Sequence, residues 1–207
     1  MPRLVPLAVL LSALLLAPHP SSSQTNPDLP PDLPPGQPQI AFTLEYRLER
    51  NLGGRFDWGK RRLFVSGPHS RDELLDGELE RFTVLADRDQ RLVLRFEPDD
   101  PARIAKRQAW NDGRSLPLLA QGYGTVAARL GPPRLLGERQ IAGQTCLRLV
   151  WEIVGERQEW CVTAQGLALA ARRNAGANET RVEALLVELA PPDSSLFTLP
   201  PGFTATE

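Results

Sequence analysis

Apolar and polar residues alternate along several stretches of the chain, and the first of these lies at residues 40–49. Its apolar members are Ile40, Phe42, Leu44, Tyr46 and Leu48. A period of two is typical of a β-strand that buries one face and exposes the other. The same period returns at residues 82–86 and 92–96. The polar segment 87–90 lies between these two runs, so they are predicted to form a hairpin.

The last third of the chain carries the same pattern in a denser form. Its alternating apolar residues before Gly155 are Leu147, Leu149, Trp151 and Ile153, and those after it are Trp160, Val162, Leu167 and Leu169. This spacing predicts a meander of strands that turns near Gly155. A strongly apolar run at 181–189 predicts one further strand, which ends before Pro191 and Pro192.

One stretch has the spacing of an amphipathic helix. Its apolar stripe consists of Leu119, Tyr123, Val126, Ala127 and Leu130. Gly131, Pro132 and Pro133 end it, and Gly122 and Gly124 weaken it by roughly 1 kcal/mol each relative to alanine. Residues 102–110 fit either a short second helix or an extended segment. The predicted fold class is α+β, with a mostly antiparallel sheet packed on one or two helices.

The N-terminus differs in composition from the rest of the chain. Residues 1–23 combine Arg3, an apolar run at 4–17 and three serines, which is the pattern of a secretory signal peptide. The run is too short to span a bilayer, and no cysteine near the cut offers a lipid anchor. The mature protein is therefore expected to be soluble and periplasmic or secreted. Six prolines in residues 24–38 predict a disordered linker, and residues 39–207 suit a single domain.

The charges of the chain nearly cancel, with 24 basic and 25 acidic residues. This balance gives no electrostatic case for binding nucleic acid or an anionic membrane surface. The densest basic cluster, Lys60-Arg61-Arg62, follows Arg55 and Asp57 and is interpreted as a solvated turn.

Two cysteines, Cys146 and Cys161, flank the turn predicted near Gly155. Each alternates with the aromatic residues beside it, so a two-residue turn would put both sulfur atoms on the face of the sheet opposite those aromatics. A disulfide is then sterically reasonable, and an exported chain favours it over free thiols.

Few residues remain for catalysis or metal binding. The mature protein would carry one histidine, His69, and no nucleophile motif accompanies it. The carboxylate pairs Asp87/Asp89 and Asp99/Asp100 fall where turns between strands are expected. We therefore predict no catalytic residue, no metal site and no cofactor, and a hydrolase that uses paired carboxylates is the weakest functional alternative.

Three segments of the last third resemble a family of exported bacterial proteins. They are Arg139 to Cys146 (RQIAGQTC), Glu159 to Leu167 (EWCVTAQGL) and Ser195 to Phe203 (SLFTLPPGF). Their order is similar to that of an uncharacterised, DUF4412-like family, which itself looks related to the periplasmic carriers of outer-membrane lipoproteins, the LolA/LolB-like proteins. The resemblance covers roughly residues 134 to 205.

This resemblance implies a strongly curved, half-barrel-like sheet over one or two helices, with an apolar concavity that shelters acyl chains. The side chains that would line it are Phe42, Leu44, Tyr46, Leu147, Leu149, Trp151 and Trp160. The alternative is that they are ordinary core residues, which is the simpler explanation for any one of them. The expected function is non-catalytic binding of a lipid or of a lipoprotein acyl chain. The alternative is a structural or interaction module that binds another protein of the cell envelope.

Overall fold

The computed structural model describes residues 33–111 and 115–207, so the predicted signal peptide and most of the predicted linker lie outside the described residues. Twelve strands form one open sheet in the order β12-β6-β5-β4-β3-β2-β1-β11-β10-β9-β8-β7. The first six strands are β1 (Phe42–Leu52), β2 (Arg55–Ser66), β3 (His69–Gly77), β4 (Thr83–Asp87), β5 (Leu92–Phe96) and β6 (Ile104–Gln108). The remaining six are β7 (Arg134–Ile141), β8 (Gln144–Ile153), β9 (Glu156–Val162), β10 (Ala168–Ala175), β11 (Asn178–Glu188) and β12 (Thr204–Thr206).

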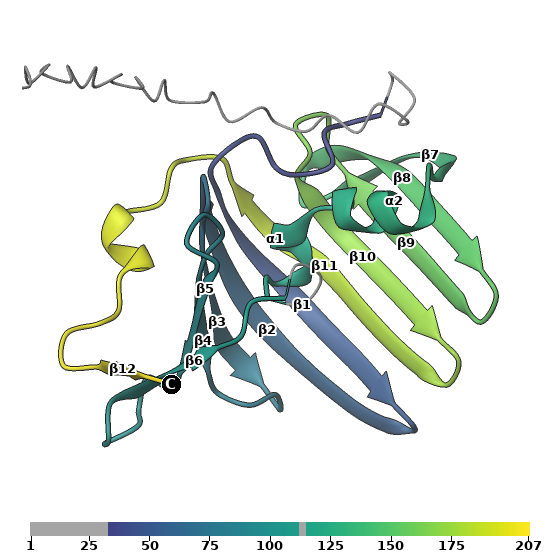
Figure 1. Cartoon of the computed structure of the whole chain (residues 1–207). Coiled ribbons are helices and arrows are strands. Elements are labelled where there is room, and N and C mark those ends of the chain that lie inside the picture. The colour runs from purple at the N-terminus through teal and green to yellow at the C-terminus, as the bar shows by residue number, and fades with distance from the viewer. Residues whose placement is uncertain (1–32, 112–114) are drawn as a thin grey trace, which may run out of the picture.

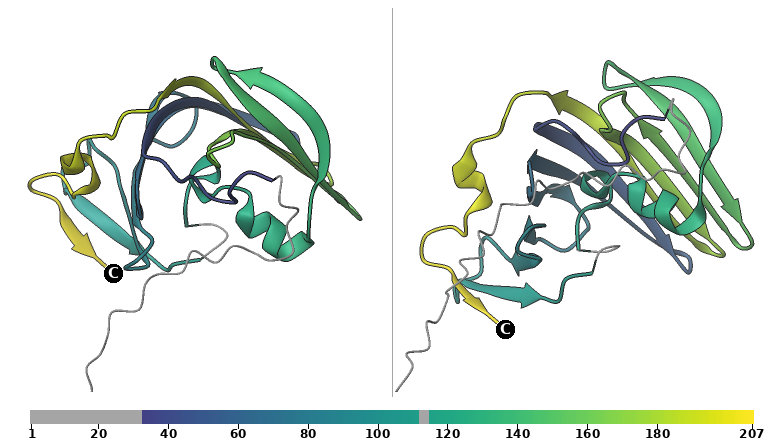
Figure 2. Two further views of the ribbon diagram at one scale, coloured as in Figure 1. Left: turned by 90° about the horizontal axis from the view of Figure 1, so that it is seen from above. Right: turned by 45° about the horizontal axis from the view of Figure 1, so that its top comes forward.

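Two short helices, α1 (Leu118–Gln121) and α2 (Gly124–Leu130), lie on the concave side of the curved sheet (Figures 1 and 2). A single-turn 3-10 helix, η1 (Ser194–Phe197), belongs to the C-terminal segment. Every strand pair is antiparallel except β12 with β6. The sheet is therefore mixed, and most of it is the curved antiparallel sheet that was predicted.

The larger core fills the space between the concave face and the two helices. Phe42 and Leu44 of β1 are completely buried there, and so is Leu63 of β2, which pairs with Leu44. Leu149 of β8 and Trp160 of β9 are paired on neighbouring strands, and both side chains belong to the same core. The period-two pattern of the sequence thus produces one continuous apolar face, as expected for a half-buried sheet.

The helices cover only part of the sheet, which differs from the prediction. A second, smaller core of Leu85, Leu94, Phe96 and Ala105 lies on the outer face of β4 to β6. Leu199 and Phe203 pack onto it from the C-terminal segment, and the Phe96 and Phe203 ring centroids are 4.9 Å apart. The sheet is therefore covered on opposite faces at its two ends.

Two local predictions are wrong. Lys60-Arg61-Arg62 is not a solvated turn but the middle of β2, where Arg61 is only 2% exposed. The predicted single helix is interrupted at Gly122, whose φ of 67° lies in the left-handed region. A Cβ added at Gly122 would stand 2.2 Å from the Gly36 carbonyl oxygen, so a close approach by another part of the chain requires glycine here.

Other local predictions are confirmed. The hairpin around residues 87–90 joins β4 to β5, and β8 turns into β9 at Val154-Gly155. The run at 181–189 lies largely within β11. The ambiguous segment 102–110 contains strand β6 and no helix.

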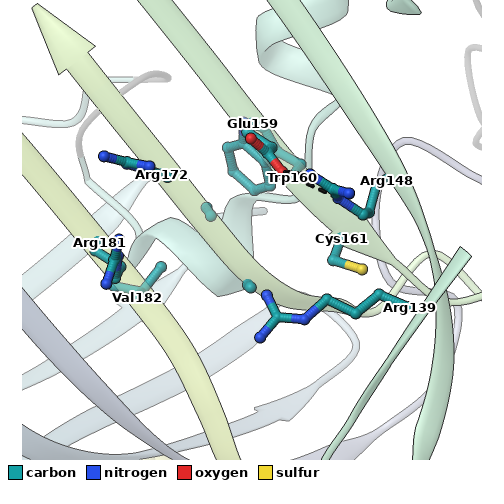
Figure 3. A pocket seen from close by; sticks show the side chains of 10 residues that line it. Arg139, Arg148, Glu159, Trp160, Cys161, Arg172, Arg181 and Val182 are labelled. Carbon is teal, nitrogen blue, oxygen red and sulfur yellow. Dashed lines mark hydrogen bonds and ion pairs between the residues drawn. The ribbon is translucent and has the colours of Figure 1, made fainter. Parts of the chain in front are cut away.

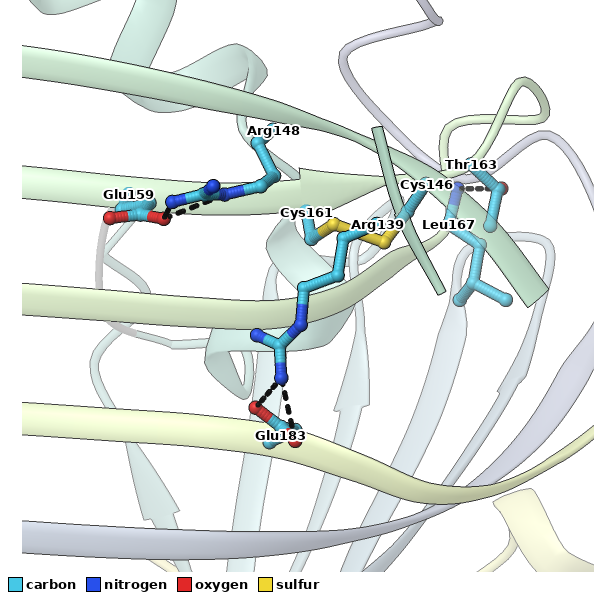
Figure 4. The surroundings of a disulfide bond; sticks show 8 residues. All are labelled: Arg139, Cys146, Arg148, Glu159, Cys161, Thr163, Leu167 and Glu183. Carbon is cyan, nitrogen blue, oxygen red and sulfur yellow. Dashed lines mark hydrogen bonds and ion pairs between the residues drawn. A yellow bond between two sulfur atoms is a disulfide. The ribbon is translucent and has the colours of Figure 1, made fainter. Parts of the chain in front are cut away.

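The predicted disulfide joins Cys146 of β8 to Cys161 of β9. Both cysteines lie on the outer face of the sheet and are almost fully buried, and Arg139 of β7 crosses close to the bond (Figure 4). The cross-link closes a loop with a sequence separation of 15 residues. It ties the two strands at the end away from their shared turn.

Replacing both cysteines with alanine is expected to lower the free energy of unfolding by roughly 3 kcal/mol, because the loop is no longer closed in the unfolded chain. Denaturant unfolding of the oxidised wild type and of the C146A/C161A variant measures the difference. A difference below about 1 kcal/mol would show that the bond adds little to stability.

Candidate functional site

The candidate site is the apolar concave face together with the helical segment 116–131 that covers it. We call this segment the flap. The structure brings all seven predicted lining residues to this face. Six of them are buried in the large core, and Leu147 packs partly buried against it. The seven residues therefore share one face of the sheet, as predicted. Their role in lining a ligand site stays a prediction.

The flap contributes mainly apolar side chains to the interface with the sheet. Leu119, Tyr123 and Ala127 are at most 2% exposed, and Val126 is 8% exposed. The Tyr123 and Trp151 ring centroids are 5.8 Å apart. Burial raises the pKa of Tyr123 to about 12. The helical stripe predicted from the sequence is therefore the surface that meets the sheet, despite the break at Gly122.

Three hydrogen bonds among the described residues help to hold the flap in place. The indole Nε1 of Trp151 donates a 2.8 Å hydrogen bond to the Gly131 carbonyl, at the end of α2. The Gly124 amide donates a 2.8 Å bond to the Gly36 carbonyl, and the Tyr123 hydroxyl donates to the Pro34 carbonyl. The last two contacts bind the flap to the strand-free segment before β1 rather than to the sheet. Residues 33–38 therefore act as a brace across the flap.

A buried polar cluster lies on the same concave face, next to the apolar core. Arg61 Nε donates a 2.9 Å bond to one carboxylate oxygen of Asp72, and the Tyr46 hydroxyl donates a 2.9 Å bond to the other. Arg61 also donates to the Phe82 carbonyl and stacks over the Phe82 ring at 4.9 Å. The cluster fastens β1, β2 and β3 to the loop before β4.

Burial dominates the electrostatics of this cluster. It raises the pKa of Asp72, although hydrogen bonds from Tyr46 and the charge of Arg61 act in the opposite direction. Burial, together with the nearby Asp72 carboxylate, raises the pKa of Tyr46 well above its usual value. The sequence analysis identified Tyr46 but missed its two partners. The available signal was Arg61, which shares the parity of Leu63 and Val65 and so must point to the buried face.

The described residues offer no metal centre, since no three histidine, cysteine, aspartate or glutamate side chains converge among them. Two of the carboxylates named as catalytic alternatives accept hydrogen bonds from backbone amides. Asp87 accepts a bond from the Gln90 amide and Asp100 accepts one from the Ala102 amide, as turn residues do. His69 lies on β3 with its Nδ1 3.5 Å from Asp87. His69 and Asp87 pair across β3 and β4 and lie on the outer face of the sheet.

No helix in the described ranges has the length and apolar character needed to cross a membrane.

Known proteins resemble this chain in structure rather than in sequence. No protein-family model matches the sequence, and no curated protein matches it either. The structure is similar to that of MucB, with a TM-score of 0.53 and 16% identity over 80% of this chain and 59% of the MucB chain. An uncharacterised conserved protein of Thermus thermophilus has a TM-score of 0.53 and 12% identity, over 81% of this chain and 90% of its own. The chain shares its fold with these two proteins.

The chain spans about three-fifths of the MucB chain that it matches. A LolA-superfamily protein of Nitrosomonas europaea, NE2245, is also among the similar structures. It is 13% identical over 78% of this chain and 91% of its own, with a TM-score of 0.41.

Replacing Asp72 with alanine is expected to lower the free energy of unfolding by about 3–5 kcal/mol, because Arg61 would keep a buried charge without its partner. Denaturant unfolding of D72A measures this loss. The triple variant Y46F/R61M/D72L removes all three polar partners together and should recover most of the stability. A single variant as stable as the wild type would show that the cluster is not a buried charge pair.

Proposed function

We propose that this protein is a non-catalytic binding protein that works outside the cytoplasm and binds an acyl chain of a lipid or lipoprotein on the concave face, in place of the flap. The observation that carries the proposal is the way the apolar face is covered. The face is continuous across β1, β2 and β8 to β11, yet its cover is a separate segment of two short helices. The similarity to MucB supports the fold on which the proposal rests.

The flap has little helical stability of its own. Its helices contain four and seven residues, and no side-chain cap satisfies the first amides of either one. Isolated helices shorter than about 12 residues are marginal in water. Packing on the sheet and the brace at residues 33–38 therefore hold the flap in place, and it can leave the sheet without unfolding a strand.

An acyl chain can replace the contacts that the flap makes. Burying one methylene is worth about 0.8 kcal/mol, so a chain of roughly 12 methylenes offers about 10 kcal/mol. Full burial of a leucine or valine side chain is worth about 1.5–3 kcal/mol, so Leu119 and Val126 together contribute about 3–6 kcal/mol. The methylenes of the acyl chain therefore more than replace the burial of these two side chains.

A second candidate is binding of another envelope protein, and one observation favours it. Two depressions in the described part of the chain lie on the outer face and at the hairpin ends, with charged residues in their lining. The buried side chains of the flap and of the concave face belong to one packed core. Apolar side chains are also exposed at hairpin ends, where Val154 is fully exposed and Phe56 is 54% exposed. A contiguous patch of exposed apolar side chains would mark a protein contact.

Quenching by a brominated lysophospholipid distinguishes the two candidates. Trp151 and Trp160 are buried on the concave face, whereas Trp58 lies on the outer face, where Arg47 stacks over its ring at 5.0 Å. An acyl chain bound on the concave face is expected to quench the wild type. It should quench the W151F/W160F variant several-fold less, and W58F is the matched control that should be quenched as strongly as the wild type.

Quenching that disappears in W58F and persists in W151F/W160F would place the lipid on the outer face and contradict the proposal. Saturating lipid that quenches none of the three proteins would favour the protein-binding candidate.

A further inference from the structure

The outer face carries an arginine-lined depression that the acyl-chain proposal does not use. Its volume is about 290 Å³, and four arginines from four strands line it: Arg139 of β7, Arg148 of β8, Arg172 of β10 and Arg181 of β11. Figure 3 shows these side chains arranged around one space. The depression lies on the face of the sheet opposite the flap, so the two sites are separate.

Register explains why the arginines meet. Ala170 of β10 pairs with Cys161 of β9 on one side and with Glu183 of β11 on the other. A small residue at this position leaves a hollow in the outer face, and the buried disulfide continues its floor. Arg172 pairs with Arg181 two residues along the same face. Arg139 reaches over from β7 and binds Glu183 of β11 (Figure 4).

Carboxylates neutralise most, but not all, of this charge. Arg148 binds Glu159 at 2.6 Å, Arg139 binds Glu183 at 3.1 Å, and Arg172 binds Glu179 at 2.7 Å. Arg181 has only a 4.0 Å approach to Glu179, which already accepts a bond from Arg172. Four guanidinium groups thus share three carboxylates, and Arg181 is the least satisfied of them.

The remaining donors favour a compact anion over another carboxylate. Arg172 uses its Nε and Arg139 uses one terminal nitrogen in the bonds described above, although each guanidinium carries five N–H donors. Like-charged groups held close together bind a dianion well, and the planar fork of arginine matches phosphate oxygens. All four arginines are between 36% and 50% exposed, so a ligand can reach them from water.

We propose that this depression binds a phosphate group, with Arg181 and Arg139 as its main ligands. The phosphate could belong to a soluble ion or to a phosphomonoester headgroup, since both present the same dianionic oxygens. Binding would compete with Glu179 for Arg172 and Arg181. The affinity should therefore rise when that carboxylate is removed and fall when Arg181 is removed.

Isothermal titration with inorganic pyrophosphate at low ionic strength tests the site on the full protein. We expect R181Q to weaken binding at least five-fold and E179Q to strengthen it at least two-fold. The matched control is R55Q, which removes one arginine from a hairpin end, where Arg55 is 81% exposed and pairs with Asp57. It should stay within two-fold of the wild type. Circular dichroism confirms that each variant is folded.

Co-sedimentation with phosphatidic acid vesicles separates the two sources of phosphate. Pyrophosphate binding that R181Q weakens supports the site for a soluble phosphate. Binding to the vesicles alone, lost in R181Q and kept in R55Q, supports the same site for a lipid headgroup. Binding to neither probe would overturn the proposal. Equal losses in R181Q and R55Q would overturn it as well, because they would indicate only general attraction to a charged protein.

Discussion

The apolar concave face of the sheet must be kept from water, and most other features of the structure follow from this constraint. An open sheet with one apolar face is stable only when another layer covers that face. Here the cover is the flap over β1, β2 and β8 to β11. Because the flap is short and partly held by residues 33–38, the stability of the core and the accessibility of the face depend on the same contacts.

The two faces of the sheet use different physical chemistry. The concave face is largely apolar and carries the buried charged cluster of Tyr46, Arg61 and Asp72, whose members satisfy one another. The outer face carries arginine and glutamate side chains on neighbouring strands, with a disulfide among them. Exposed ion pairs of this kind contribute little stability each. They leave donors available to a ligand, which the buried cluster does not.

The sequence predicted the parts of the fold that repeat a simple period. The alternation around Phe42 and Leu44 and the one around Leu149 and Trp151 correctly identified which residues meet on the concave face. The parity of Cys146 and Cys161 correctly placed the disulfide on the other face. The local pattern is sufficient for these features because successive side chains of a strand point to opposite faces of the sheet. The position of a residue along its strand therefore determines which face it occupies.

The missed features depend on pairing between distant segments. Strand β2 was not recognised at Lys60-Arg61-Arg62, because three adjacent basic residues are usually solvated. Arg61 is buried only because Asp72 of β3 is its partner. β3 itself, with the sequence HSRDELLDG, has too few apolar residues for its pattern to predict a strand. The C-terminal segment completes a second core that no periodicity reveals, and the arginine depression collects side chains from four strands.

Hydrogen–deuterium exchange of the flap, with and without a saturating lysophospholipid, tests the central claim most directly. If the acyl chain replaces the flap on the sheet, backbone amides of residues 116–131 should exchange faster in the presence of the lipid. Amides of β1 and β8 to β10 should remain protected in both conditions. Lipid binding that leaves the exchange of the flap unchanged, or that slows it, would contradict the account.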